Sequence, residues 1–201
     1  MHQIKTQIIV PYTNIRPDEK IYAQAKIDRK KETEEVDNAR VDIYNHELAR
    51  KILAEAALGF YFAATLLAFF YLYRKDEKLS LWMMRLAGAG ALLHLASFGV
   101  RLEQFWLIPE NRYFLPINSF FGALSYLSMA AALVFFVVER EHRLGILGAF
   151  VLPWSVIGLG TAVVYADPKV VGLVPDLQSY WLNIHPMVLM TAYAVLGNAF
   201  G

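Results

Sequence analysis

The sequence predicts an all-α fold, a polytopic transmembrane helical bundle of about five spans with a polar helical N-terminal segment. Hydrophobic residues make up 57% of the 201 residues and aromatic residues 14%. The mean hydropathy of +0.36 is unusually high for a soluble domain. Long uncharged runs recur along the chain, and roughly 17–25 apolar residues cross the hydrocarbon core of a bilayer. Because an unpaired strand edge is not stable in lipid, these runs predict helices.

Residues 1–50 form a polar, charge-balanced segment, which we separate from a transmembrane part at residues 51–201. Its run DRKKETEEVDNAR mixes both signs closely, which is typical of a solvated helical surface, so residues 23–50 are predicted to be mostly helical. We assign no chemistry to this segment. It lacks the pattern of a signal peptide, and Gly201 follows uncharged residues with no basic anchor. We therefore expect the chain to be a piece of a longer protein.

The spans follow in order along the rest of the chain. The first uncharged run is just long enough to cross a bilayer, and the second is short unless Arg85 extends to the surface and residues 81–84 face lipid. The other three runs have full spanning length. The five predicted spans are residues 56–73, 86–100, 113–138, 144–166 and 177–201.

Basic residues predict the orientation of the spans. They are concentrated in two connections, with Arg74, Lys75, Lys78 and Arg85 between spans one and two and Arg140 and Arg143 between spans three and four. The opposite connections hold fewer, namely Arg101, Arg112 and Lys169. The positive-inside rule makes the first two connections cytoplasmic. Residues 101–115, residues 167–180 and the N-terminal segment are then extracytoplasmic.

The fifth span begins with a histidine, His185, four residues after Trp181. Tryptophan favours the membrane–water boundary, so His185 is expected near the outer surface of the bilayer. An ionisable group in that position indicates function, and imidazole is a common metal ligand and axial ligand of haem iron. The alternative is a histidine that only hydrogen-bonds to a neighbouring helix.

A second histidine, His94, lies within the second span, and Arg101 follows it by seven residues. Two helical turns place both on roughly one face, with Arg101 nearer the outer surface. The pair could contact a haem, with the arginine beside a propionate. The alternative is a buried histidine bonded to a neighbouring serine, with Arg101 extending outward.

Composition excludes several function classes. With no cysteine, the chain cannot be a thiol–disulfide carrier, an iron–sulfur protein or a cytochrome with covalently attached haem. Gly88, Gly90 and Gly99 lie inside a span, where close helix packing explains them better than phosphate binding. The net charge of +1 argues against nucleic acid as a partner.

Three segments carry a family resemblance. The segment LVPDLQSYWLNIH, which ends at His185, resembles the stretch before a haem-ligating histidine in the CcsA/ResC type of cytochrome c biogenesis protein. The segment LPINSFFGALSYLSM is similar to that family's Pro-x-Ser-Asn-x-Tyr-Glu-Ser entrance to a span. The segment VDIYNHELARKILAEAALGFYF resembles versions fused to a ResB-type partner. The likeness extends over residues 40–201, and we expect a fragment of such a fused form.

The resemblance implies a function in cytochrome c maturation. His185 would be an axial ligand of the iron, Trp181 and Tyr180 would pack beside the porphyrin, and His94 and Arg101 would be secondary contacts. Haem b would be held transiently at the periplasmic face of a bacterial inner membrane and presented to apocytochrome c. The implied partners are apocytochrome c, a ResB-like domain or subunit and the bilayer. A complete protein of this family would be a component of a cytochrome c haem lyase.

The chain departs from the family pattern at two places. Phe121, Gly122 and Ala123 replace the usual tyrosine, glutamate and serine at the entrance to the third span. Pro186 follows His185, and because a residue before proline disfavours helical geometry, we expect His185 just outside the helix. Two alternative functions remain open. One is an electron-transfer membrane subunit with a b-type haem ligated by His94 and His185, and the other is a non-catalytic subunit held by packing alone.

Overall fold

The computed structural model describes residues 17–142, 145–173 and 179–200, and their fold is helical. Five long helices and one short 3₁₀ helix follow one another along the chain, and no strand occurs in these ranges. They are α1 (Pro17–Arg74), α2 (Glu77–Trp106), η2 (Pro109–Asn111), α3 (Phe120–His142), α4 (Leu147–Tyr165) and α5 (Tyr180–Phe200). The all-α fold is therefore confirmed.

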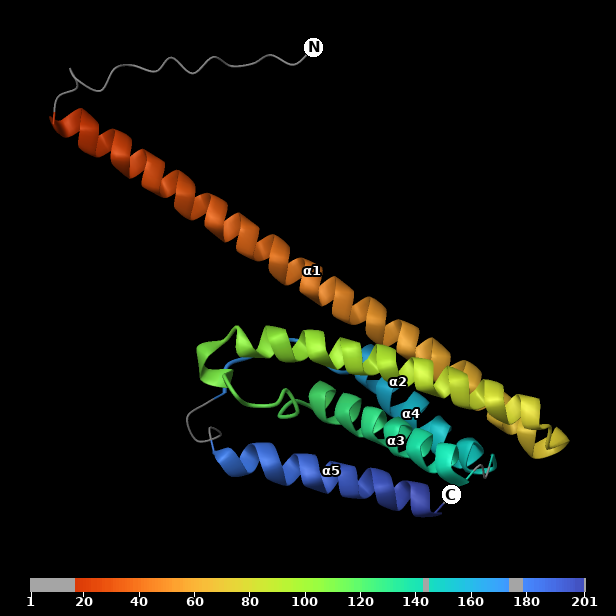
Figure 1. Cartoon of the computed structure of the whole chain (residues 1–201). Coiled ribbons are helices and arrows are strands. Elements are labelled where there is room, and N and C mark those ends of the chain that lie inside the picture. The colour runs from red at the N-terminus through yellow and green to blue at the C-terminus, as the bar shows by residue number, and fades with distance from the viewer. Residues whose placement is uncertain (1–16, 143–144, 174–178, 201) are drawn as a thin grey trace, which may run out of the picture. The chain divides into compact units, whose positions relative to one another are not determined.

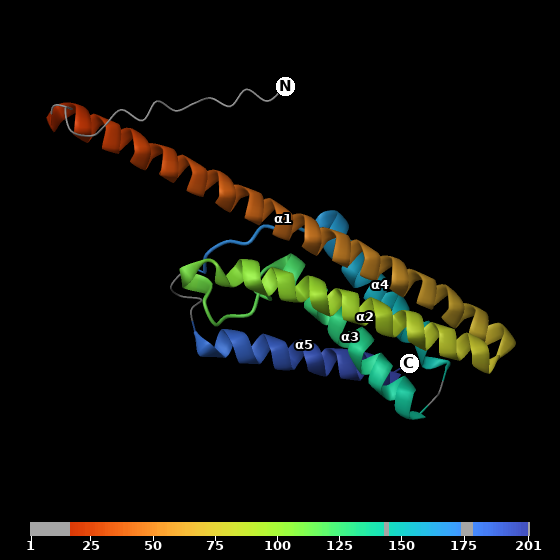
Figure 2. The same ribbon diagram turned by 45° about the horizontal axis from the view of Figure 1, so that its top comes forward.

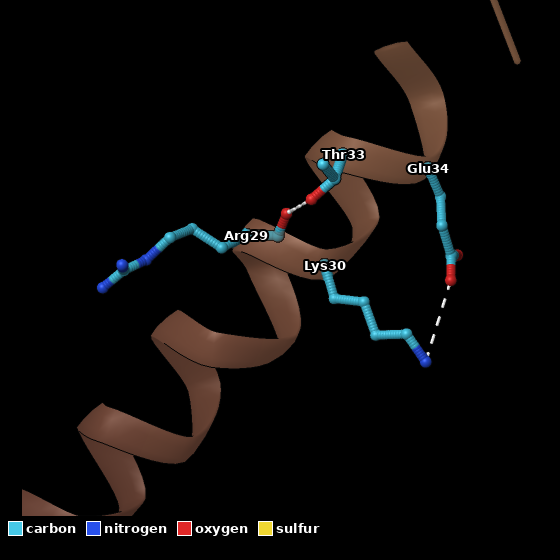
Figure 3. Close-up of polar contacts among 4 residues, drawn as sticks. All are labelled: Arg29, Lys30, Thr33 and Glu34. Atoms are coloured by element: carbon cyan, nitrogen blue, oxygen red, sulfur yellow. Dashed lines mark hydrogen bonds and ion pairs between the residues drawn. The ribbon is translucent and has the colours of Figure 1, made fainter. Parts of the chain in front are cut away.

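The chain divides into two compact units, Met1–Tyr44 and Asn45–Gly201. The described part of the first unit is the beginning of α1, and its described side chains are exposed. Lys30 Nζ lies 3.8 Å from Glu34 Oε1, and Thr33 donates a hydrogen bond to the carbonyl of Arg29 (Figure 3). An ion pair of this spacing stabilises a helix by only about 0.2–0.5 kcal/mol, as is typical of a solvated helix surface and not of a core. The prediction of a helix after residue 23 is confirmed.

The second unit is a helical bundle with α3 at its centre. Helix α3 packs against α2, α4 and α5 (Figures 1 and 2). The largest cluster of buried side chains joins the end of α1 to α2, α3 and α4, around Ala68, Met83, Phe135 and Leu152. A second cluster surrounds Tyr61, which is fully buried. Through these apolar contacts, α1, α2, α3 and α4 pack together.

Small residues bring α2 close to its neighbours. A methyl group added at Gly90 would lie 2.8 Å from the Tyr61 ring, and one added at Gly88 would lie 2.8 Å from the Phe136 ring. Both glycines therefore allow a close helix approach, as their place inside a span predicts. The expectation of close helix packing is wrong for Gly99, because a methyl group added there would have no neighbouring atom within 4 Å.

Among the described residues, four helical segments are long and apolar enough to cross a membrane, so the protein is an integral membrane protein. They are Val41–Arg74, Glu77–Trp106, Phe120–His142 and Leu147–Tyr165. The fifth predicted span corresponds to α5, whose described apolar stretch Ile184–Phe200 is shorter. The third span begins later than predicted, because residues 113–119 belong to the connection that leads into α3.

Polar contacts place the connections at the two ends of the bundle. Asn111 is fully buried, donates from Nδ2 to the Val171 carbonyl (2.9 Å) and accepts from the Leu173 N–H at Oδ1 (2.7 Å). The α2–α3 and α4–α5 connections therefore meet at one end, as the predicted topology requires. At the other end, Glu139 accepts hydrogen bonds from Ser80 and from the Gly145 N–H.

Candidate functional site

His185 lies on the surface of α5, close to the beginning of the helix. Trp181 is one turn earlier and is 73% exposed. Both side chains line an open hollow of about 430 Å³, together with Ser179 and Pro186. No hydrogen bond from the described part of the chain engages the imidazole of His185. An accessible imidazole beside an indole can bind a metal through nitrogen while a flat ligand packs on the ring.

The expectation that His185 lies outside the helix is wrong. Helix α5 begins at Tyr180, so His185 and Pro186 are both inside it. Pro186 lacks the N–H that would bond to the carbonyl four residues earlier, so one intrahelical bond is missing from α5. The helix nevertheless continues through Pro186. As a result, His185 and Trp181 share one helical face through their spacing of four residues.

Of the described side chains that line the hollow, one could bind a metal through nitrogen, the imidazole of His185. No cluster of three or more histidine, cysteine, aspartate or glutamate side chains occurs among the described residues. The side chain of Tyr180, the other predicted aromatic contact, lies outside the part that the structure describes. The donor chemistry therefore fits one axial position of an iron porphyrin, supplied by a neutral imidazole.

His94 lies inside the bundle, fully buried between α1, α2 and α3. Its Nδ1 is 3.3 Å from the hydroxyl of Tyr61, and its Nε2 is 2.9 Å from Oγ of Ser125. Both ring nitrogens thus have partners on neighbouring helices. This arrangement favours the serine-bonded alternative over a haem contact, since no nitrogen of His94 is left to face a ligand. The sequence pointed to the serine but gave no sign of the tyrosine.

Arg101 is also buried, with 2% of its surface exposed. It donates from Nη1 to the Pro168 carbonyl (2.8 Å) and from Nη2 to Oγ of Ser119 (3.1 Å). The guanidinium carbon lies 4.5 Å from the centre of the Phe121 ring. The sequence-based alternative expected Arg101 to extend outward into solvent. The side chain is instead buried among these partners. It holds the α4–α5 connection against the beginning of α3.

Sequence reasoning missed Arg50, which lies in the segment that we treated as solvated. Its side chain is buried, and its guanidinium carbon lies 5.0 Å from the centre of the same Phe121 ring. The carbonyl of Arg50 accepts a hydrogen bond from Ser97 (2.9 Å). The position of Arg50 six residues before the first uncharged run was the available signal, because arginine at the edge of a span often packs against protein.

Comparison with known proteins finds a family that is similar to the C-terminal part of the chain. The family described as "Cytochrome C assembly protein" matches residues 117–201, which include α3, α4 and α5 with His185. Residues 117–201 are therefore similar to this cytochrome c assembly family. The CcsA-type resemblance of the sequence is thereby confirmed. No solved structure matches the chain.

Individual relatives support the same family. The "Cytochrome c biogenesis protein CcsA" of Heterosigma akashiwo is 35% identical over 95 residues, which cover 45% of this chain and 30% of that protein. The protein of the same name from Trichormus variabilis is 30% identical over 114 residues, 55% of this chain and 32% of its own. "Protein NrfI" of Wolinella succinogenes is 32% identical over 85 residues, 41% of this chain and 9% of its own. The chain thus spans about a third of the length of these CcsA relatives.

Proposed function

We propose that this protein takes part in cytochrome c maturation and holds haem, its cargo, at the extracytoplasmic face of the membrane. The observation that carries the proposal is the accessible imidazole of His185 beside Trp181 at the beginning of α5. Residues 117–201, which match the cytochrome c assembly family, include both side chains. The names of the matching relatives, cytochrome c biogenesis proteins, support the same process.

In this proposal, His185 supplies one axial nitrogen to the iron and Trp181 packs against the porphyrin. Tyr180 adds a second aromatic side chain, as the family resemblance implies. The thiols that react with haem come from the Cys-Xaa-Xaa-Cys-His motif of apocytochrome c, which agrees with a chain that contains no cysteine. A ResB-like protein is the proposed partner, and the complete assembly acts as a cytochrome c haem lyase.

The orientation follows from the basic residues at the opposite end of the bundle. Arg74, Lys75 and Lys78 surround the α1–α2 connection, and the positive-inside rule assigns that end to the cytoplasm. His185 then faces the periplasm of a bacterial cell. A cysteine introduced by Trp181→Cys should react with a membrane-impermeant maleimide added to intact spheroplasts, because the native chain has no competing thiol. Reaction only after the membrane is opened would contradict this orientation.

Haem retention tests the function directly. The protein should copurify with haem from haem-replete cells, and His185→Ala should lose most of the Soret absorption because one axial bond disappears. His142→Ala is the matched control, because His142 is exposed and is the last residue of α3, at the end of the bundle opposite His185. An unchanged spectrum in His185→Ala would contradict the assigned role. A wild-type protein without Soret absorption would favour the packing-only alternative instead.

The electron-transfer alternative is disfavoured by the surroundings of His94. A b-type haem ligated by His94 and His185 needs a free nitrogen on each ring, whereas both nitrogens of His94 have partners, Tyr61 and Ser125. In our proposal His94 and Arg101 support the site through packing and not as ligands. The spectrum of bound haem should therefore be the same in His94→Gln and wild type, although the variant should be less stable because contacts of the imidazole are lost.

A further inference from the structure

Two arginine side chains converge on one aromatic ring at the end of the bundle where the α2–α3 and α4–α5 connections meet. The guanidinium carbons of Arg50 and Arg101 lie 5.0 Å and 4.5 Å from the centre of the Phe121 ring. Arg50 is 7% exposed and Arg101 is 2% exposed. Two positive charges therefore share one largely buried place, which is costly unless a negative charge is close by.

The described part of the chain offers no ion pair to either guanidinium group. Arg101 donates to two neutral oxygens, the Pro168 carbonyl and the Ser119 hydroxyl, and its Nε–H has no hydrogen-bond partner. Glu47, one turn before Arg50, acts on it electrostatically but is exposed and beyond the 4.0 Å of an ion pair. A negative group from outside the chain would satisfy both arginines.

The two arginines lie at the edge of the hydrocarbon region. Arg50 precedes the uncharged run 56–73 by six residues, and Arg101 directly follows the uncharged run 86–100. Their common contact with Phe121 keeps them at one level. The phosphates of lipid head groups lie at this depth in a bilayer, just outside the hydrocarbon core.

Small cavities open beside both arginines. One of about 190 Å³ is lined by Arg50, Lys51 and Phe121 among others, and another of about 210 Å³ is lined by Arg101 and Lys169 among others. Sites that enclose a drug-sized organic ligand usually measure roughly 300–1,000 Å³. The cavities therefore suit a head group and not a porphyrin, and each has an exposed lysine at its rim.

We propose that Arg50 and Arg101 bind the phosphate group of an anionic phospholipid, with Lys51 and Lys169 at the rim of the site. A guanidinium group binds phosphate through two parallel N–H···O bonds. The Arg50 guanidinium lines one cavity and donates no hydrogen bond within the described residues, whereas the unpartnered Nε–H of Arg101 is enclosed by protein. Phospholipid and free phosphate share this chemistry, so the test includes both. Arg101 also supports the haem site through packing, but neither arginine is a haem ligand in our proposal, so lipid binding is measured separately from haem retention.

Native mass spectrometry of the purified, detergent-solubilised protein tests the site. Phosphatidylglycerol and inorganic phosphate are each titrated alone against the wild type and against Arg50→Gln and Arg101→Gln. We expect retention of phosphatidylglycerol to fall at least about tenfold in each variant, because a charge-assisted hydrogen bond is lost. Arg112→Gln is the matched control, an exposed arginine at the same end of the bundle, and it should bind like the wild type.

The variants separate the possible outcomes. Arg50→Gln is decisive because the Arg50 side chain donates no hydrogen bond within the described residues, whereas Arg101 donates two, so the fold depends less on Arg50 than on Arg101. Arginine-dependent binding of phosphatidylglycerol but not of inorganic phosphate supports a lipid site, and arginine-dependent binding of inorganic phosphate at similar affinity supports a site for free phosphate. Wild-type binding by Arg50→Gln, or an equal loss in Arg112→Gln, would overturn the proposal.

Discussion

Replacing His94 by phenylalanine should weaken the contact between α1, α2 and α3 while keeping a flat ring in the same space. The substitution removes a hydrogen bond of 2.9 Å to Ser125 and a longer one of 3.3 Å to Tyr61. Side-chain hydrogen bonds in membrane proteins average about 0.6 kcal/mol and reach about 1.7 kcal/mol. A buried hydroxyl left without a partner costs about 1–3 kcal/mol. We therefore expect the free energy of unfolding to fall by about 1–3 kcal/mol.

Reversible unfolding of the detergent-solubilised protein by sodium dodecyl sulfate measures this change. A double-mutant cycle with Tyr61→Phe isolates the bond between the two rings, which should contribute less than about 1 kcal/mol because of its length. Leu92→Phe is the control, since Leu92 lies on the exposed face of the same helix. A free energy of unfolding of His94→Phe within about 0.3 kcal/mol of the wild type would refute the reasoning. Such a difference is smaller than the average contribution of a single side-chain hydrogen bond in a membrane protein.

Two further substitutions test the ends of α3. Gly122→Ala should lower the free energy of unfolding by at least about 1–3 kcal/mol in the same assay. The new methyl group would collide with the Pro116 carbonyl oxygen, which is a backbone atom. Glu139→Gln should cost about 1 kcal/mol and increase proteolysis of the α3–α4 connection, because its carboxyl group accepts the Gly145 N–H at 2.9 Å with both oxygens.

Each of these predictions has a matched control. Gly99→Ala should be harmless or slightly stabilising, since a methyl group there meets no atom within 4 Å and alanine favours a helix. Glu141→Gln changes an exposed carboxyl group two residues from Glu139 and should leave proteolysis unchanged. A Gly122→Ala protein as stable as Gly99→Ala, or equal proteolysis in both glutamate variants, would contradict the packing described for α3.

The helices could be predicted from the sequence because lipid allows few alternatives to a helix for a long uncharged run. Their ends were less predictable. The run 113–138 contains no charge, yet α3 begins only at Phe120, after a connection in which the buried side chain of Asn111 bonds to the neighbouring loop. Composition cannot distinguish apolar residues of a packed connection from those of a span. Similarly, α5 continues through Pro186, as α4 does through Pro153, because membrane helices tolerate proline inside them.

The candidate site was predictable only where it depends on local spacing. The four-residue interval between Trp181 and His185 was sufficient to place both on one helical face. The environments of His94, Arg50 and Arg101 depend on contacts between segments that are far apart in sequence. Tyr61, for example, lies 33 residues before His94. Mixed charges around Arg50 suggested a solvated helix, whereas packing against Phe121 buries this one side chain.

Chemical rescue by imidazole tests the role of His185 most directly. His185 lines an open hollow, so a small ligand can reach the iron once its side chain is removed. We expect His185→Ala to lose the Soret band of the copurified haem and to recover it, when haem is supplied, on addition of imidazole. A variant that keeps the wild-type spectrum without imidazole would contradict the account, as would one that imidazole fails to restore.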